Sequence, residues 1–457
     1  MTFSYAQLKE WDHAYVWHPF TQMQDWLAED PLIIASGEGN YVIDVHGAKY
    51  LDGISSLWCN VHGHNHPTIN AAIAAQLSHI AHATLLGQAN IPSILLAKKL
   101  VELAPSGLTR VFYSDAGATA VEIALKLAFQ YWQLKGTAHK VKFASLLEAY
   151  HGDTLGAMGV GYSEVFHHYY RPVLTDAFRL TPPHYFRFYK GMSEANALTA
   201  AVQEARTVLS AHREEIAAVI VEPLMQGAAG MWAQPVAYVQ ALRKITTECD
   251  ILLICDEVAT GFGRTGRMFA CEHADIRPDL LCIAKGITGG YLPLAATLAN
   301  EEIFSAFLAP YEEFKTFFHG HTYTGNPLAC AAALANLEVF EQDQVLDKLE
   351  AKIRLLTEKL HTDFAPLAHV ADIRQWGMMV GIELMRDPKH KVPYATAEKI
   401  SIRVITEARK HGVIIRPLGN VIVLMPPLSI SLEELLFLLD VVHTAIVTVT
   451  ENTCTAS

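Results

Sequence analysis

Short apolar runs alternate with amphipathic stretches through the middle of the chain. Each run has the length of a strand that is buried on both faces. The runs cover residues 110–113, 141–146, 217–221, 251–255 and 280–284. Between them, apolar residues recur at helical spacing over 91–103, 118–134, 194–213 and 235–248. The alternation predicts an α/β fold with a mostly parallel sheet flanked by helices.

The two ends of the chain follow a different pattern. Apolar and polar residues alternate over 33–51 around two turn signals, which predicts a small antiparallel hairpin. A long helix begins after Asn326, and the pattern beyond it predicts strands over 378–384, 413–416 and 421–425 and helices over 396–411 and 431–447. We therefore predict three parts: an N-terminal segment (1–60) that contributes to a smaller α+β domain, a large domain (61–330) and a C-terminal small domain (331–457).

The first 30 residues are rich in aromatic side chains, which an exposed tail would have little use for. They include Trp11, Tyr15, Trp17, Phe20 and Trp26. We expect this segment to pack on another part of the protein or on a partner subunit.

Composition and charge narrow the class of protein. The net charge is -12 and no long basic run occurs, which gives no support to a nucleic-acid or membrane partner. The most apolar stretch, 432–449, is interrupted by charged residues at helical spacing, so we expect an amphipathic helix. The start of the chain lacks the pattern of a secretory signal, and the seven cysteines form no C-x-x-C pair. These features predict reduced thiols and a cytoplasmic location.

Three alternating histidines, His62, His64 and His66, resemble a metal site, because on a strand they would share one face. Gly63 and Pro67 favour a loop instead, and no acidic or cysteine ligand lies nearby in the sequence. We therefore expect no metal here.

Two of the apolar runs are each followed by a charge. Asp256 comes directly after 251–255, and Lys285 comes directly after 280–284. Parallel strands bring their carboxyl ends to one edge, so both charges should face the same crevice. A lysine there loses hydration, which lowers its pKa and favours a nucleophilic amine. Taken singly, Lys285 could simply reach the surface and Asp256 could cap a turn.

As a pair, these residues match the needs of pyridoxal phosphate (PLP). This cofactor requires a lysine to bind its aldehyde and a carboxylate to keep its ring nitrogen protonated. The sequence therefore predicts a PLP site with Lys285 and Asp256 as catalytic residues.

Other strand ends supply candidates for the same site. Small residues over 116–118 open a helix, where backbone N–H groups could hold a phosphate, although a tight packed turn would look the same. Tyr150 and His151 offer flat rings that could stack on a cofactor or lie at the surface. Glu222 ends another apolar run and could contact a ligand or cap a turn.

Two later features have their own alternatives. Thr322 lies in a polar loop and could donate to a phosphate. Arg416 closes an apolar run and could hold a substrate carboxylate through two hydrogen bonds, or be an ordinary surface arginine. The motif GFGRTG (261–266) matches a dinucleotide fingerprint, but it lies deep in the chain and opens no helix, so we interpret it as a flexible loop and expect no NAD.

Together these phrases resemble the class III aminotransferases, PLP enzymes of fold type I. The core of the resemblance is LLICDEVATGFGRTG followed by DLLCIAKGITGG. Further segments, WHPFTQM, SSLWCNVHGHNHP and HGHTYTGNPLACAAA among them, are similar to the branch of this class that acts in biotin biosynthesis. The resemblance covers nearly the whole chain and implies transfer of an amino group to 8-amino-7-oxononanoate, with another class III activity on an ω-amino acid or diamine as the alternative.

The resemblance also implies a role for each site residue. Lys285, Asp256 and Tyr150 would be catalytic. PLP would be bound by Gly117, Ala118, Tyr150, His151, Glu222, Asp256, Lys285 and Thr322, with Thr322 contributed by the other subunit of a homodimer. The substrates would be bound by Phe20, Leu57, Trp58, Tyr150, Lys285, Gly320, Arg416 and Val423.

Four of these positions depart from the best-known members, whose amino donor is S-adenosylmethionine. Those members have tyrosine in place of Phe20, tryptophan in place of Leu57 and tyrosine in place of Val423, and a serine is common in place of Ala118. The pocket is thus less polar and less aromatic. We expect lysine to be favoured over S-adenosylmethionine as the donor.

Overall fold

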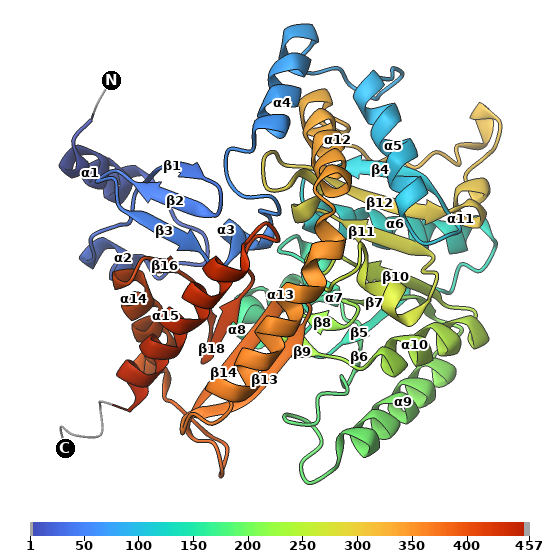
Figure 1. Cartoon of the computed structure of the whole chain (residues 1–457). Helices are drawn as coiled ribbons and strands as arrows, with labels where there is room; N and C mark the ends of the chain where they lie inside the picture. The colour runs from blue at the N-terminus through green and yellow to red at the C-terminus, as the bar shows by residue number, and fades with distance from the viewer. Residues whose placement is uncertain (1–2, 452–457) are drawn as a thin grey trace.

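The largest sheet of the protein, seen in a computed structural model that describes residues 3–451, has seven strands (Figure 1). In spatial order they are β4 (Leu108–Ser114), β12 (Ala295–Asn300), β11 (Leu280–Ile283), β10 (Leu252–Asp256), β7 (Ile216–Val221), β5 (Lys142–Leu146) and β6 (Phe178–Leu180). All neighbours pair in parallel except β12, which is antiparallel to both β11 and β4. The predicted α/β fold with a mostly parallel sheet is confirmed.

Helices cover both faces of this sheet. Along β10, Leu253 and Cys255 enter one hydrophobic cluster, whereas Leu252 and Ile254 enter a second one. Side chains of a strand alternate between its faces, so both faces are buried and the strand appears in the sequence as one apolar run. The second cluster includes α6 (Gly117–Leu134) and α7 (Leu155–Val160), and the first includes α5 (Ile91–Leu103), α9 (Glu194–Ala211), α10 (Val236–Glu248) and α12 (Pro327–Gln342).

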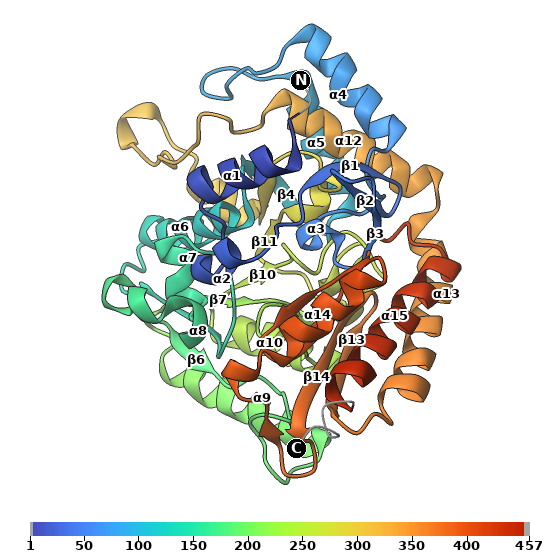
Figure 2. The ribbon, with the colours of Figure 1, turned by 90° about the vertical axis from the view of Figure 1, so that its left-hand side faces the viewer.

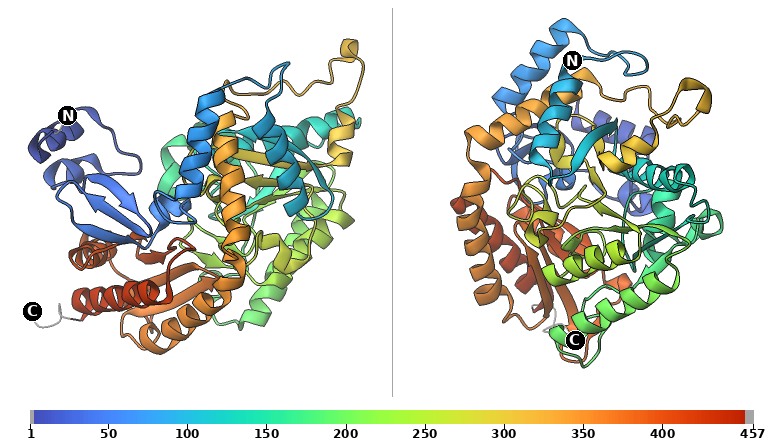
Figure 3. Two further views of the ribbon diagram at one scale, coloured as in Figure 1. Left: turned by 45° about the horizontal axis from the view of Figure 1, so that its top comes forward. Right: turned by 90° about the vertical axis from the view of Figure 1, so that its right-hand side faces the viewer.

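Residues 34–52 form three antiparallel strands where we expected a hairpin. The strands are β1 (Ile34–Glu38), β2 (Tyr41–Asp44) and β3 (Lys49–Asp52). A strand from the far end of the sequence, β16 (Val413–Ile414), pairs with β3 in parallel. The left view of Figure 3 accordingly shows the N-terminal strands beside the C-terminal helices.

The third sheet comes from the C-terminal part of the chain. It contains β13 (Val370–Trp376), β14 (Met379–Asp387), β15 (Val392–Pro393), β17 (Arg416–Leu418) and β18 (Val421–Leu424). Figure 2 shows α13 (Val345–Lys359), α14 (Ile400–Lys410) and α15 (Leu432–Thr450) around it. The domain boundaries after residues 60 and 330 stay a prediction.

Two expected elements differ from the structure. The strand expected over 413–416 is divided between β16 and β17, because the chain passes from one sheet to another at Ile415. The helix expected over 396–411 starts only at Ile400, since Lys399 adopts a positive φ of 46° after a short 3-10 turn. The remaining elements are α3 (Ser55–Trp58), α4 (Pro67–His79), α8 (Glu164–His167), α11 (Glu301–Ala306), β8 (Met225–Gln226) and β9 (Trp232–Ala233).

The aromatic N-terminal segment forms α1 (Tyr5–Tyr15) and α2 (Met23–Ala28). No residue of either helix is buried, and the Tyr15 and Trp17 side chains are more than four-fifths exposed. The segment therefore does not bury these rings on its own chain, and packing on a partner subunit stays a prediction. Between residues 3 and 451, none of the helices combines the length and the apolar character needed to span a membrane.

Candidate active site

Five parallel strands end at one edge of the large sheet, and a candidate residue follows each of them. Lys285 comes two residues after β11, Asp256 is the last residue of β10, and Glu222 directly follows β7. Gly117 follows β4, and Tyr150 lies four residues after β5. A cavity of about 630 Å³ opens at this edge. Besides these five residues, its lining includes Trp58, Cys59, Ala118, His151, Asp153, Val258, Thr288 and Tyr291.

Lys285 presents an amine without a fixed partner. Within residues 3–451, its Nζ atom makes no hydrogen bond or ion pair, and it lies 4.9 Å from the centre of the Trp58 ring. Burial lowers the pKa of this amine, while Asp256 and Glu222 act weakly in the opposite direction. The residue also adopts a positive φ of 47°, which is strained for a side chain other than glycine. The amine is therefore buried without a partner in the described part of the chain, and its lowered pKa favours the neutral form.

Asp256 is fixed by a neighbour that is 105 positions away in the sequence. Its Oδ2 atom lies 2.7 Å from Nδ1 of His151, and its Oδ1 atom accepts the N–H of Val258 at 3.1 Å. Both side chains of the Asp256–His151 pair are buried. Nε2 of His151 is buried and has no partner within the described chain. The pair holds a carboxylate in one orientation at the base of the cavity.

Glu222 is a second buried carboxylate at this edge. It accepts the N–H of Tyr150 at 3.2 Å and that of Gly227 at 2.9 Å. Burial raises the pKa of Glu222 to about 7, His151 lowers it, and Asp256 raises it further. Glu222 thus links the loops after β5 and β7, and its charge depends on pH near neutrality.

The ring of Tyr150 forms part of the cavity wall. Its hydroxyl donates to Asp153 at 2.6 Å, and its ring stacks on His167 with the centres 6.0 Å apart. Phe166 meets the Tyr150 ring edge-on, and Phe20 meets Phe166 in the same way at 5.8 Å. This series of rings connects the N-terminal segment to the cavity.

The start of α6 has the shape of an anion site. The first N–H groups of a helix have no partner within the helix. A Cβ atom placed on Gly117 would lie 2.5 Å from Cγ1 of Val258, so a larger residue there would force the Val258 side chain to move. One on Gly152 would collide with Ala118. The two glycines thus let backbone from two loops close around the start of the helix, where the helix dipole favours negative charge.

The other predicted substrate residues are not part of the cavity lining. Phe20, Leu57 and Arg416 are exposed, and Val423 is buried in the same hydrophobic cluster as Trp58. Val423 pairs directly with Arg416 across β17 and β18. Their contact with a substrate stays a prediction.

Gly320 and Thr322 are exposed on the loop before α12, and neither lines the cavity of the single chain. Their expected roles therefore depend on a second subunit and also stay a prediction.

Sequence reasoning missed several residues of the cavity. Asp153 and Cys59 both line it, yet neither was singled out. The position of Asp153 three residues after Tyr150 was a usable signal, since a short loop can bring an acid and a hydroxyl together. Cys59 gave no signal, because its place depends on the strained turn that precedes it.

Two motifs turn out to have structural partners. His62 contacts the carbonyl of Asn336 at 3.1 Å, and Nε2 of His64 bonds to Asp52 at 3.0 Å.

GFGRTG is a loop, but the expectation that it is flexible is wrong. Phe262 and Arg264 are buried, and the Arg264 guanidinium donates to the carbonyls of Asn60 and Pro426. The loop is therefore packed between segments from both ends of the chain.

The cavity suits PLP on chemical grounds. It combines an amine of lowered pKa, a buried carboxylate, an aromatic wall and a helix start that accepts an anion. These are the groups needed for the aldehyde, ring nitrogen, ring face and phosphate of that cofactor.

Comparison with known proteins agrees with this chemistry. The profile of the family described as Aminotransferase class-III matches residues 24–446. The chain is 49% identical over 444 residues to the adenosylmethionine-8-amino-7-oxononanoate aminotransferase of Geobacter sulfurreducens, covering 97% of this chain and 98% of that protein.

Solved structures give the same result. The crystal structure of adenosylmethionine-8-amino-7-oxononanoate aminotransferase from Methanocaldococcus jannaschii matches with a TM-score of 0.92 and 47% identity, covering 97% of this chain and 99% of that one. An ω-transaminase from Pseudomonas jessenii in complex with PMP matches with a TM-score of 0.94 and 30% identity, covering 98% and 100%. The chain belongs to the class III aminotransferases, PLP-dependent enzymes that transfer amino groups.

Proposed function

We propose that this enzyme transfers an amino group to 8-amino-7-oxononanoate and forms 7,8-diaminononanoate, a step of biotin biosynthesis. The observation that carries the proposal is the match over nearly the full length, at about half identity, to relatives whose names contain this acceptor. Identity at this level over both ends of the chain supports a shared substrate pocket as well as a shared fold.

In this proposal each buried residue at the sheet edge has one task. Bound there, PLP supplies the electron sink that makes a C–H bond of the donor amine acidic. Lys285 would accept the proton released at the donor carbon and deliver it to the cofactor carbon that takes over the nitrogen, which its lowered pKa favours. Asp256, held by His151, keeps a proton on the ring nitrogen. The N–H groups of Gly117 and Ala118 hold the phosphate, and Tyr150 covers the ring.

The substrate is held by residues at the rim. The acceptor ends in a carboxylate, and Arg416 can bind it with two charge-assisted hydrogen bonds. Trp58 supplies an apolar wall for the chain of methylene groups, since its ring lies close to both Gly227 and the amine of Lys285. Phe20, Leu57 and Val423 complete the apolar part of the pocket.

Two observations favour different amino donors. The names of the relatives contain adenosylmethionine. The side chains of Phe20, Leu57 and Val423 instead favour lysine, because they replace the tyrosine and tryptophan residues of the best-known members that use S-adenosylmethionine. We keep lysine as the preferred donor, to be decided by the measurement below.

We further propose a homodimer with shared active sites. Gly320 and Thr322 are too exposed to complete the cavity of their own subunit. Three large rings of the same exposed segment, Tyr311, Phe318 and Tyr323, also face solvent in the single chain. A partner that covers these rings would bring Thr322 to its own phosphate site. Light scattering should give twice the mass of one chain, and a monomer that is fully active would contradict the proposal.

A second candidate is an ω-amino acid transaminase. It is favoured by the ω-transaminase of Pseudomonas jessenii, whose TM-score of 0.94 is as high as that of the biotin-pathway relative. That protein is only 30% identical, so the fold alone does not separate the two activities.

The test separates the donor from the acceptor. The PLP form is mixed with lysine or with S-adenosylmethionine, and the cofactor spectrum shows which one converts it to pyridoxamine phosphate. The converted enzyme then receives 8-amino-7-oxononanoate or an ω-keto acid. We expect conversion by lysine and reaction with 8-amino-7-oxononanoate. Conversion by S-adenosylmethionine alone would refute the lysine donor, and reaction with only the keto acid would favour the second candidate.

Cys59 permits a test of the cofactor position that does not depend on activity. Of the six cysteines within residues 3–451, the other five are buried. A thiol reagent should therefore label Cys59 in the PLP-free protein, and added PLP should protect it. Peptide mapping separates this label from one on Cys454, which lies outside the described residues. Equal labelling with and without PLP would mean that the cofactor binds elsewhere.

A further inference from the structure

The segment Ser55–Trp58, called here the Trp58 turn, has a strained backbone. Ser55, Ser56 and Trp58 have φ values of 54°, 61° and 64°, although none of them is glycine. Such conformations persist only where the surroundings impose them. The turn ends in the indole ring beside the amine of Lys285. Whatever holds the turn therefore also sets the position of that ring.

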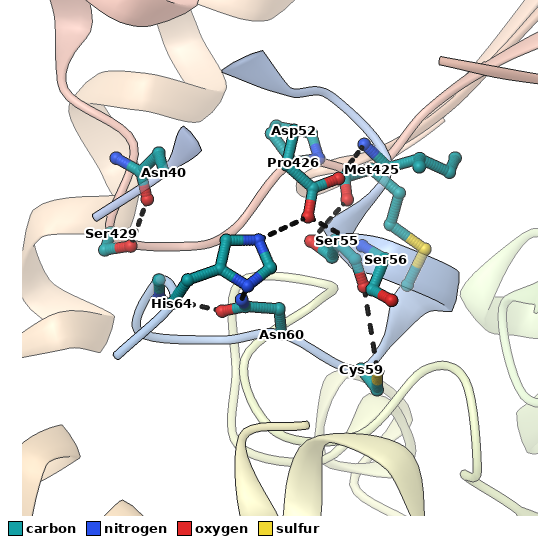
Figure 4. Close-up of polar contacts among 12 residues, drawn as sticks. Asn40, Asp52, Ser55, Ser56, Cys59, Asn60, His64, Met425, Pro426 and Ser429 are labelled. Carbon is teal, nitrogen blue, oxygen red and sulfur yellow. Dashed lines mark hydrogen bonds and ion pairs between the residues drawn. The ribbon is translucent and has the colours of Figure 1, made fainter. Parts of the chain in front are cut away.

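The carboxylate of Asp52 binds the backbone of the turn. It accepts the N–H of Ser56 at 2.7 Å and the N–H of Ile54 at 3.2 Å, and the side chain is buried. A second anchor is the hydroxyl of Ser55, which donates to the carbonyl of Met425 at 2.6 Å. Figure 4 shows both contacts at the junction between the N-terminal strands and the C-terminal sheet.

His64 orients the carboxylate of Asp52 as part of a series of hydrogen bonds in which the donor and acceptor of each bond are defined. An ionised carboxylate only accepts hydrogen bonds, so the proton between Asp52 and His64 lies on Nε2 of His64. Nδ1 of His64 then accepts from the side-chain amide of Asn60 at 3.1 Å. The amide oxygen of Asn60 in turn accepts the N–H of Gly63 at 2.8 Å. Figure 4 shows the contacts of the His64 ring with Asp52 and Asn60.

The indole ring of Trp58 is closely surrounded by other residues. A Cβ atom on Gly227 would lie 3.1 Å from the Trp58 ring, and Lys285 Nζ lies 4.9 Å from its centre. Trp58 also packs in a buried cluster with Met225 and Val423. A small change in the backbone of the turn would therefore move the ring against the amine or away from it.

We propose that Asp52 and His64 are positioning residues for the reaction: they hold the Trp58 turn, and through Trp58 they set the position of the Lys285 amine and of the substrate. Neither residue lines the cavity, so both act through the turn. The inference rests on one part of the proposed function, namely that Lys285 supplies the reacting amine. It does not depend on the identity of the acceptor.

The first experiment follows the half-reaction with the amino donor by the cofactor spectrum. Asp52→Asn should slow it by about 10- to 100-fold, because the reacting groups are misplaced. In a Trp58→Ala background, the same change should cost less than about threefold, since the residue through which Asp52 acts is gone. An equal loss in both backgrounds would overturn the proposal, as would an unchanged rate after Asp52→Asn in the otherwise unaltered enzyme.

Asp44→Asn is the matched control. Asp44 is also a buried carboxylate of the N-terminal sheet, and it accepts the N–H groups of His46 and Ala48, both at 2.9 Å. Its loss should destabilise the sheet and leave the half-reaction within about twofold. If Asp44→Asn slowed the reaction as much as Asp52→Asn does, general destabilisation would replace positioning as the explanation.

The second experiment compares two variants of His64 in the half-reaction and then follows hydrogen exchange of the cofactor-free protein. His64→Gln keeps a donor near Nε2 and should retain most of the rate, whereas His64→Leu should lose part of it. Amide hydrogen exchange over 54–60 should speed up in His64→Leu and Asp52→Asn but not in Asp44→Asn. Unchanged exchange in both His64→Leu and Asp52→Asn would overturn the proposal. A Lys285→Ala protein that still completes the half-reaction would instead count against the proposed function.

Discussion

The sheet edge that carries Lys285, Asp256 and His151 is buried and densely hydrogen-bonded, whereas the rim that carries Phe20, Leu57 and Arg416 is open to solvent. At the edge, burial shifts the pKa values of Lys285 and Glu222, and hydrogen bonds fix Asp256 and Glu222 to residues of neighbouring loops. At the rim, the side chains are held by few contacts, and the Phe20 side chain is 58% exposed.

In the proposed function, this difference separates the residues of the reaction from those that select the substrate. At the edge, replacing Asp256 with an apolar residue would leave the buried ring of His151 without its partner, which is costly. A group at the rim can be exchanged at little cost in stability. One buried edge can therefore serve many substrates, and the four predictions below test whether the two regions are as independent as this comparison implies.

The largest effect is expected at Lys285. Lys285→Ala should lower turnover by about 10²- to 10⁴-fold, because a positioned proton-transfer group is lost, and PLP should no longer be fixed to the protein by borohydride. The matched control is Lys140→Ala, since burial lowers the pKa of Lys140 as well, but its amine donates to the carbonyl of Asp250 away from the cavity. The control should lose stability and keep its turnover. Retained turnover in Lys285→Ala would end the proposed function.

The next effect concerns the pH dependence of stability. The pKa of Glu222 is raised from 4.5 to about 7 in the folded protein, so the folded state binds more protons between these values. Its contribution to the free energy of unfolding should therefore fall as pH rises from about 4.5 to 7 and stay low above it.

Glu222→Gln removes this titration. Relative to the unaltered protein, the variant should gain on the order of 2 kcal/mol of unfolding free energy between pH 5 and pH 8. Urea unfolding of the cofactor-free protein at both pH values measures the gain. A difference that does not change with pH would show that burial does not govern this carboxylate.

Arg416 tests the rim. Arg416→Ala should raise KM for 8-amino-7-oxononanoate by about 10- to 100-fold, the equivalent of one or two hydrogen bonds between charged groups. KM for the donor and the melting temperature should hardly change, because the side chain is exposed. Arg403→Ala, an exposed arginine on α14, serves as the control. An equal effect on donor and acceptor would remove the assigned role.

Phe20 should give the smallest effect. Phe20→Tyr adds one hydroxyl next to Phe166, which packs on the ring of Tyr150. One additional hydrogen bond corresponds to about fivefold in the ratio of kcat/KM for S-adenosylmethionine to that for lysine. Unfolding should be unaffected. A ratio that does not move would show that donor choice lies elsewhere, with Leu57 and Val423 as the remaining positions.

Much of the candidate site was predictable because its residues lie at the ends of apolar runs that can be recognised in the sequence. Asp256, Lys285 and Glu222 each follow an apolar run, and parallel strands bring such ends together by geometry alone. Ala118 and Gly117 were visible as small residues between a strand and a helix. Two predictions were less accurate. The hairpin expected over 33–51 has a third strand, β3, which pairs with the distant strand β16. The GFGRTG loop is buried, because Arg264 donates to the carbonyls of the distant residues Asn60 and Pro426.

The sequence by itself determined which residue types stand at the strand ends and therefore that an amine and a carboxylate share one edge, because strand and helix periodicities are local. Only the tertiary structure decided which partner each group has. His151 fixes Asp256 from 105 positions away, and Asp52 imposes a strained turn that no local pattern favours. The pKa values of Lys285 and Glu222 likewise depend on burial by distant segments, which periodicity does not specify.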